Sequence, residues 1–351
     1  MKVSKLLRHG EYLRPAYMPA KGQHQSAAGV STDQARPDGK LSGTVKRFAK
    51  KQPAGKDVLS LGFITAVYKH AVSFIGVGQG IRGYGLAAGL LCFSIGAFAT
   101  TYEILDGTFS PNADIVAIVL GRFIVVPGSI YFAIVMSLKM WRIEMFCPLD
   151  EPTIFDREHR KVYRLFRELP AGWFGQFKPW PMRACEYDWD LIDVEHVAQL
   201  GTNGSTVSRR HALMFIVRKN ATDPTIIDSF NIGNGLVMNE ITTPAVWEHI
   251  RRYMEENGPP VPGGEPLAQY EAPQTLWQCM GAVGVFGKGY LTWWKTNPTF
   301  TFFSHLAFPL FLPINLVVGF GNWLSRKTAY PVEWPQEVLD AIGQPEQRRD
   351  V

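Results

Sequence analysis

Two long apolar segments dominate the pattern of hydrophobic and polar positions along the chain. They cover residues 84–102 and 115–138, and a short acidic segment separates them. An α-helix needs about 20 apolar residues to cross a hydrocarbon layer of about 30 Å, and a helix satisfies its own backbone there. The pattern therefore predicts an integral membrane protein with a transmembrane helical hairpin.

Charged residues beside these segments predict the orientation of the hairpin. The connector carries Glu103, Asp106 and Asp114 but neither Lys nor Arg, whereas both outer flanks are basic. Because Lys and Arg collect in cytoplasmic loops, both ends of the hairpin are expected in the cytoplasm. The flanking basic residues are Lys46, Arg47, Lys50, Lys51, Lys56, Lys69 and Arg82 before the hairpin, and Lys139 and Arg142 after it.

The chain before the hairpin divides into two parts. Residues 1–53 are rich in Gly, Ala, Ser, Gln, Pro and Lys, and they are predicted to form a disordered basic leader without a cleavable signal peptide. Residues 58–75 are apolar but interrupted by Lys69 and His70. They are predicted to form a helix in the membrane interface, as part of a membrane region at 54–149.

Apolar and polar residues begin to alternate after Asp150, as they do in strands. Residues 150–258 are therefore predicted to form a cytoplasmic, antiparallel β domain, with turns at 156–160 and 219–224. Residues 183–191 alternate strictly, which assigns Glu186, Asp188 and Asp190 to a solvated face and Cys185, Tyr187, Trp189 and Leu191 to the other face.

A helix at 244–257 is expected to close this domain. Thr243 is its predicted cap and Pro244 lies in its first turn. The charged residues around its apolar stripe, Glu248, Arg251, Arg252 and Glu255, are candidates for binding a protein partner. The stripe consists of Val246, Trp247, Ile250, Tyr253 and Met254.

The C-terminal part contains a second apolar region. Residues 300–323 are long enough to cross a membrane, but Pro309 and Pro313 would kink a helix and basic residues lie on both sides. A bent, re-entrant or interfacial helix pair at 276–327 is favoured over a third full span. A linker at 259–275 and a tail at 328–351 complete the expected α+β membrane protein.

Composition narrows the range of partners. The 351 residues are 46% hydrophobic and 19% charged, with a formal net charge of +5. The excess positive charge lies mainly in the leader, where it suits anionic lipid headgroups. Nucleic acid is not expected as a partner, because the leader lacks a basic face interleaved with aromatic residues. Cys92, Cys147, Cys185 and Cys279 are widely spaced and form neither a zinc motif nor a disulfide framework.

Candidate chemistry is sparse. Arg122 is the one charge within the spans, and Glu103 at the outer end of the first span is within reach of it, so a polar pair in the membrane is predicted. Gly78, Gly80 and Gly83 fit a dinucleotide-binding pattern, but a membrane span follows them, so no cofactor is expected. Several acidic residues and histidines lack metal-ligand spacing and predict neither a metal site nor a catalytic site. These are Glu186, Asp188, Asp190, Asp193, Glu195, His196, His159 and His211.

The β domain resembles the bacterial pleckstrin-homology-like domains, in its several antiparallel strands with one C-terminal helix and in the hairpin at 154–164. The whole chain also resembles an uncharacterised proteobacterial family of membrane proteins that are often encoded near type VI secretion effectors. This resemblance rests on residues 10–19, 155–164, 185–189 and 331–335. The resemblance implies a location in the bacterial inner membrane, but it identifies no functional residue.

Two function classes follow from these observations. The preferred one is a non-enzymatic membrane protein that binds a protein partner, such as an immunity or accessory factor that meets a toxin or secretion component. The alternative is a small-molecule or ion-handling protein, such as a transporter subunit, that uses Glu103, Arg122 and His305. A homo-oligomer is compatible with either class.

Overall fold

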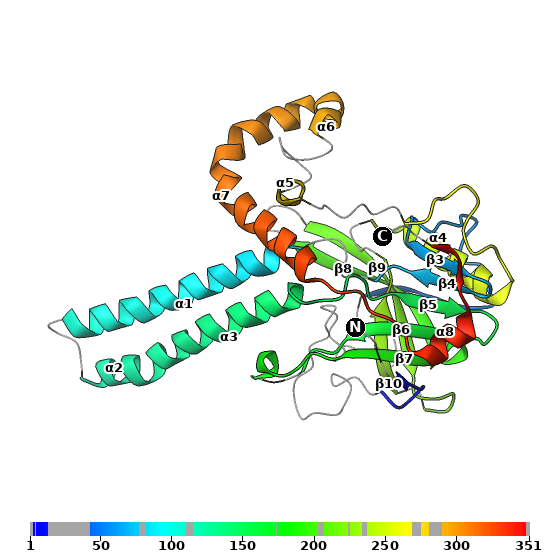
Figure 1. Cartoon of the computed structure of the whole chain (residues 1–351), viewed down its shortest axis with the longest axis horizontal. Helices are drawn as coiled ribbons and strands as arrows, with labels where there is room; N and C mark the ends of the chain where they lie inside the picture. Colours follow the sequence, from blue (N-terminus) through cyan, green and yellow to red (C-terminus); the bar gives the residue numbers. More distant parts are fainter. Residues whose placement is uncertain are drawn as a thin grey trace.

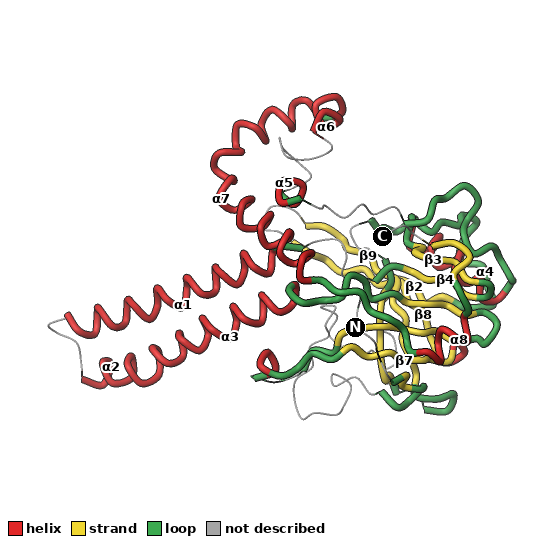
Figure 2. The backbone as a smooth tube through the Cα atoms, viewed as in Figure 1, coloured by secondary structure: helices red, strands yellow, loops and turns green. Residues whose placement is uncertain are grey.

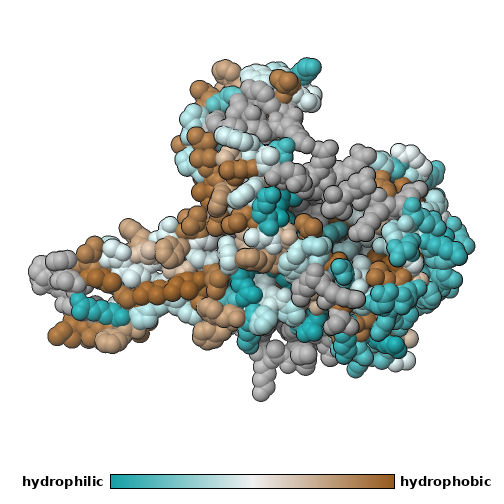
Figure 3. All heavy atoms as spheres, viewed as in Figure 1, coloured by the Kyte–Doolittle hydropathy of each residue, from teal (hydrophilic) through white to brown (hydrophobic). Residues whose placement is uncertain are grey.

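The computed structural model has a β domain from which membrane-type helices project on one side (Figure 1). Strands gather in the domain, and long helices lie outside it (Figure 2). The hairpin surface is largely hydrophobic, whereas hydrophilic residues cover much of the domain (Figure 3). The structure describes residues 3, 5–12, 43–76, 82–109, 115–170, 172, 174–202, 207–223, 225–233, 237–268, 275–280 and 290–348.

The predicted helical hairpin is confirmed. Two helical stretches, Tyr84–Leu105 and Gly121–Glu144, are long and apolar enough to cross a membrane, and little of either is buried inside the protein. They lie side by side (Figure 1). The helices are α1 (Tyr84–Phe109), α2 (Ile115–Leu120), the π-helical turn η3 (Gly121–Val125) and α3 (Val126–Glu144).

Small residues bring α1 and α3 together. The Ser137 hydroxyl donates to the Gly89 carbonyl at 2.7 Å, and the Thr100 and Ser129 hydroxyls are 2.7 Å apart. A Cβ on Gly96 would lie 2.5 Å from the Cβ of Ala133, so only glycine permits this approach. The two helices therefore pack directly through a small-residue face, the arrangement typical of close helix pairs in membranes.

The β domain consists of two sheets. The seven-stranded sheet has the order β1-β7-β6-β5-β4-β3-β11, and the four-stranded sheet has the order β10-β9-β8-β2. The first contains β1 (Leu6–Leu7), β3 (Ile64–Tyr68), β4 (Ala71–Phe74), β5 (Thr153–Asp156), β6 (Lys161–Arg167), β7 (Met182–Asp188) and β11 (Pro345–Arg348). The second contains β2 (Thr44–Phe48), β8 (Ile192–Thr202), β9 (Val207–Arg218) and β10 (Ile226–Asn231).

The helical hairpin is an insertion within the seven-stranded sheet. Strand β4 precedes it and β5 follows it, yet the two strands pair antiparallel, with Ala71 opposite Asp156 and Phe74 opposite Thr153. The interfacial helix predicted at 58–75 is therefore wrong, since this segment contains β3 and β4. A short apolar run fits a buried strand as well as a helix, and Lys69 and His70 belong to the bend between the two strands.

Two further domain predictions are also corrected. Residues 5–12 and 43–53 of the predicted leader are ordered, because β1 pairs with β7 and β2 pairs with β8. Residues 13–42 lie outside the described part of the chain. The predicted tail contributes α8 (Gln336–Ile342) and strand β11, which pairs with β3. The domain thus combines three stretches of sequence, from before the hairpin, after it and after the C-terminal helices.

Helix α4 (Thr242–Glu255) and the two sheets share one aromatic core. The ring of Phe215 on β9 lies 5.4 Å from that of Phe155 on β5 and 6.4 Å from that of Trp247 on α4. The predicted apolar stripe of α4 is buried. The N-cap residue is Ile241 rather than the predicted Thr243, and the Asn239 side chain accepts from the backbone N–H of Thr242 at 2.8 Å.

The C-terminal helices are α5 (Leu276–Cys279), α6 (Tyr290–Thr296) and α7 (Pro298–Thr328). The two parts of α7, Pro298–Ala307 and Leu312–Thr328, differ in direction by 98°. Pro309 and Pro313 lie at this bend, where each removes a backbone donor. The predicted bend is thus confirmed, and the bent pair would add a third span only if both parts crossed the membrane together.

Candidate functional site

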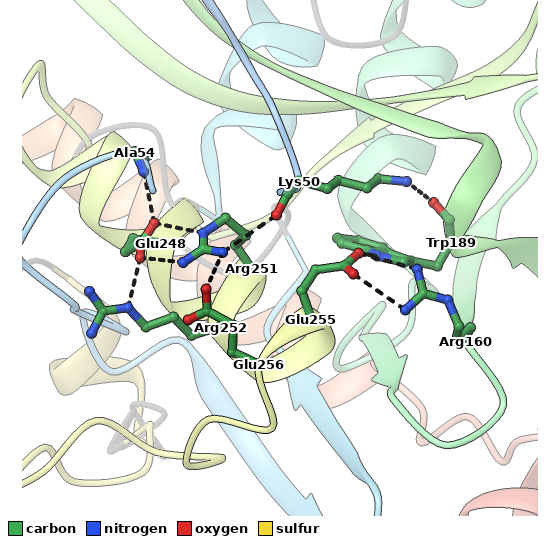
Figure 4. Close-up of polar contacts among 9 residues, drawn as sticks. All are labelled: Lys50, Ala54, Arg160, Trp189, Glu248, Arg251, Arg252, Glu255 and Glu256. Atoms are coloured by element: carbon green, nitrogen blue, oxygen red, sulfur yellow. Dashed lines mark hydrogen bonds and ion pairs between the residues drawn. The ribbon is translucent and has the colours of Figure 1, made fainter. Parts of the chain in front are cut away.

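The charged residues of α4 that were predicted to bind a partner make polar contacts within the fold (Figure 4). Glu248 is fully buried and Arg251 is 2% exposed. The Arg251 guanidinium donates to both carboxylate oxygens of Glu248, at 2.8 and 2.9 Å, and Arg252 donates to the same carboxylate at 2.7 Å. The backbone N–H of Ala54 completes the set at 2.9 Å. This group therefore holds the segment after β2 against α4.

The pKa of Glu248 reflects this arrangement. Burial alone would raise it, but the hydrogen bonds from Arg251, Ala54 and Arg252 outweigh burial and lower the pKa to about 2. The carboxylate is therefore charged at neutral pH and paired within the fold. A buried, fully paired carboxylate is not available to a partner.

Glu255 belongs to a second, neighbouring set (Figure 4). Its carboxylate accepts from the indole N–H of Trp189 at 2.6 Å and from Arg160 at 3.2 Å, and Arg160 also pairs with Asp190 at 2.5 Å. The Lys50 ammonium lies 4.6 Å from the Trp189 ring centroid, and burial lowers the pKa of Lys50 to about 8. These contacts give Glu248, Arg251 and Glu255 a structural role, whereas Arg252 is 38% exposed. A partner-binding role for Glu248, Arg251, Arg252 and Glu255 stays a prediction.

The remaining acidic residues and histidines of the domain pair locally. Lys161 contacts Glu186 at 2.8 Å and Asp188 at 2.5 Å. Asp188 and Asp190 of the predicted solvated face are 40% and 67% exposed, whereas Glu186 is 18% exposed. His196 and His211 are buried and lie 2.8 Å apart, and burial with the neighbouring His211 lowers the pKa of His196 to about 4. Among the described residues, no group of three or more His, Cys, Asp or Glu side chains is placed to hold a metal.

The two polar residues predicted to pair in the hairpin, Glu103 and Arg122, both lie near the start of its second apolar stretch, and their pairing stays a prediction. The Glu103 carboxylate lies against the backbone of Gly121, where a Cβ would be 2.7 Å from its oxygen. Gly121 begins the π-helical turn η3, which also contains Arg122. The sequence predicted that Glu103 and Arg122 lie near each other, but it did not predict the π-helical turn.

A polar junction at the base of the hairpin was not predicted. Arg82 donates to the Pro148 carbonyl at 3.0 Å and to the Ser325 hydroxyl at 3.3 Å, and Ser325 donates to the Glu144 carbonyl at 2.7 Å. The backbone N–H of Gly83 donates to the Glu144 carboxylate at 2.8 Å. These contacts join α1, α3 and α7 where they meet the domain. In the sequence, this junction was marked only by the glycines Gly78, Gly80 and Gly83 before the first span.

Strand β2 is the candidate binding edge. Among the described residues it is the last strand of the four-stranded sheet, and its pairing with β8 skips one residue between Thr44 and Lys46. That residue, Val45, is 54% exposed. An exposed edge strand can take up an extended segment of another protein by strand addition.

The fold and these contacts define a membrane protein with two candidate spans inserted into a β domain. A family model described as a family of unknown function (DUF6708) matches residues 130–342, and the chain belongs to this family. The match begins within α3 and extends to the end of α8. A comparison with curated proteins found no match, and a comparison with solved structures found none.

Proposed function

We propose that the protein is a non-enzymatic, multi-pass protein of the bacterial inner membrane that holds its β domain at the cytoplasmic face and binds a protein partner there. The insertion of the hairpin between the paired strands β4 and β5 carries this proposal, because it makes the anchor and the domain one unit. Direct packing of α1 on α3 through Gly89 and Gly96 favours an anchor over a transport path.

The resemblance to proteins encoded near type VI secretion effectors supports a toxin or a secretion component as the partner. The protein would then act as an immunity or accessory factor. The edge position of β2 supports binding by strand addition, a mode that the resemblance of the sequence to pleckstrin-homology-like domains also implies. A small-molecule or ion-handling role is the second candidate, and the Glu103 carboxylate beside the η3 turn favours it.

The proposed orientation predicts a labelling pattern. A single cysteine placed at residue 108 or 109, beside the connector, should react with a membrane-impermeant maleimide added to spheroplasts, because the connector faces outward. Glu158→Cys should react only after the membrane is opened, although the Glu158 side chain is 54% exposed. Reaction at Glu158 in intact spheroplasts would show that the domain is not cytoplasmic.

Partner binding at β2 predicts that Val45→Lys impairs capture. A lysine at the exposed position of an edge strand opposes the addition of another strand. Affinity capture from native membranes, quantified by mass spectrometry, should give a partner whose yield falls at least about tenfold with Val45→Lys, a loss of about 1.4 kcal/mol. The matched control is Val237→Lys, because Val237 is 49% exposed and lies outside the strands.

Equal capture by wild type and Val45→Lys would contradict the β2 edge as the binding site. An unrelated membrane protein of similar size serves as the control for capture. If the wild type captures no protein that this control does not also capture, the proposed binding function is contradicted.

A further inference from the structure

The loop after β6 contains two exposed aromatic rings beside the candidate spans. Phe174 is 63% exposed and Phe177 is 56% exposed, and both belong to residues 174–180, here called the aromatic loop. Its short 3-10 helix η4 comprises Gly175–Phe177. The loop lies at the side of the domain from which the helical hairpin projects (Figure 1). Exposed apolar rings that lie close together often mark a surface that contacts another molecule or a membrane.

The aromatic loop lies along α3. The ring centroids of Phe174 and Tyr131 are 6.1 Å apart, in an edge-to-face arrangement. Tyr131 is about 11 residues before Arg142, which is about 16 Å along a helix. Tyr131 therefore lies inside the apolar span, so Phe174 reaches a part of α3 that the bilayer surrounds.

The root of the loop has the residues of a membrane interface. The guanidinium groups of Arg142 and Arg167 each lie 4.9 Å from the centroid of the Trp180 ring. Arg142 donates to the Lys178 carbonyl at 3.0 Å, and Arg167 donates to the Ile143 carbonyl at the end of α3 at 2.7 Å. Trp with Arg and Lys is the combination enriched at headgroup level.

The shape of the loop is specified by its own backbone. A Cβ on Gly175 would lie 2.1 Å from the Pro170 carbonyl oxygen, so the turn requires glycine. The Gly175 carbonyl accepts from the Trp180 indole N–H at 3.1 Å and from the Lys178 backbone N–H at 3.1 Å. This geometry directs the rings of Phe174 and Phe177 to the outside of a fixed turn.

We infer that the aromatic loop inserts into the cytoplasmic leaflet, with Phe174 and Phe177 among the acyl chains and Trp180, Arg142 and Lys178 at the headgroups. The occupant of this apolar surface is thus the lipid bilayer, because the surface is continuous with the lipid-facing side of α3. On the other flank of the hairpin, α7 packs against α1 (Figure 1). The loop and α7 together would hold the domain at a fixed tilt on the membrane.

This inference rests on the proposed membrane anchoring, and fluorescence quenching by lipids tests both separately. The full-length protein with Cys92→Ala, whose remaining cysteines are buried, receives one new cysteine at Phe177, Phe98 or Glu158. Each variant is labelled with a nitrobenzoxadiazole dye and reconstituted into vesicles of phosphatidylcholine and phosphatidylglycerol. The vesicles contain spin-labelled lipid, with the spin label either near the headgroup or near the chain end.

Phe177→Cys is expected to lose most of its fluorescence to the shallow spin label, because its side chain lies in the outer part of the leaflet. Phe98→Cys, on a 73% exposed position of α1, should be quenched by the deep label. Glu158→Cys, in the turn at the far end of β5, should be quenched by neither. If Phe98 is quenched and Phe177 behaves like Glu158, loop insertion is overturned and anchoring stands. If Phe98 is not quenched, anchoring fails and the inference fails with it.

Discussion

Asp228→Ala is expected to lower the free energy of unfolding of the β domain by about 3–5 kcal/mol, because it leaves a buried charge without its partner. Asp228 is fully buried on β10 and pairs with Arg164 on β6 at 2.6 Å. The Tyr187 hydroxyl on β7 donates to the same carboxylate oxygen at 2.7 Å. This contact therefore joins the four-stranded sheet to the seven-stranded sheet through the core.

Denaturant unfolding of the detergent-solubilised protein, followed by tryptophan fluorescence, measures this effect, since Trp189 and Trp247 are buried in the same core. Tyr187→Phe removes one hydrogen bond and leaves the ion pair, so it should cost about 1 kcal/mol. Asp190→Ala removes an ion pair whose side chains are 40% and 67% exposed, and it should cost under about 1 kcal/mol. A loss for Asp228→Ala no larger than that for Asp190→Ala would contradict the role of the buried pair.

Elements whose stabilising contacts are local in sequence were predictable. The hairpin of β5 and β6 and that of β9 and β10 each pair across a short polar turn, and the sequence pattern predicted both. The apolar stripe of α4 and the two spans follow equally from the periodicity of a single segment. In each case the pattern that predicts the element lies within one continuous segment of the sequence.

Elements that pair across the helical hairpin were not predictable in this way. By sequence alone, strand β4 resembles part of a membrane helix. Its partner β5 follows only after the whole helical hairpin, so the pairing has no local signal. Strands β1, β2 and β11 are short, and they are strands only because β7, β8 and β3 pair with them. Local propensity is a weak guide when tertiary pairing decides the structure.

The charged residues of α4 show the same limit at the candidate site. On a helical wheel, Glu248 and Arg251 belong to a polar face, which normally points to solvent. In the structure the segment after β2 covers that face, and the Ala54 backbone N–H donates to Glu248. The spacing i, i+3 in the sequence is compatible with the ion pair, but it does not indicate that the segment after β2 covers this pair.

Glu248→Gln is expected to lower the free energy of unfolding at neutral pH by about 3 kcal/mol, because Arg251 is then buried without its main counter-charge. The loss should depend on pH. The folded pKa of Glu248, about 2, is below its ordinary value of 4.5, so the carboxylate stabilises the fold above 4.5. That contribution decreases as the pH falls below 4.5 and is gone below about 2.

Unfolding curves of wild type and Glu248→Gln measured between neutral pH and about pH 2 should therefore converge as the pH falls, since protonation makes the wild-type side chain neutral as well. Glu256→Gln is the matched control, because Glu256 also pairs with Arg251, at 2.7 Å, but is 52% exposed. It should cost under about 1 kcal/mol, because solvent screens an exposed pair. If the loss of unfolding free energy in Glu248→Gln stays constant over this pH range, it comes from packing and not from the charge. If Glu256→Gln loses as much, burial of the ion pair is not the cause of the loss.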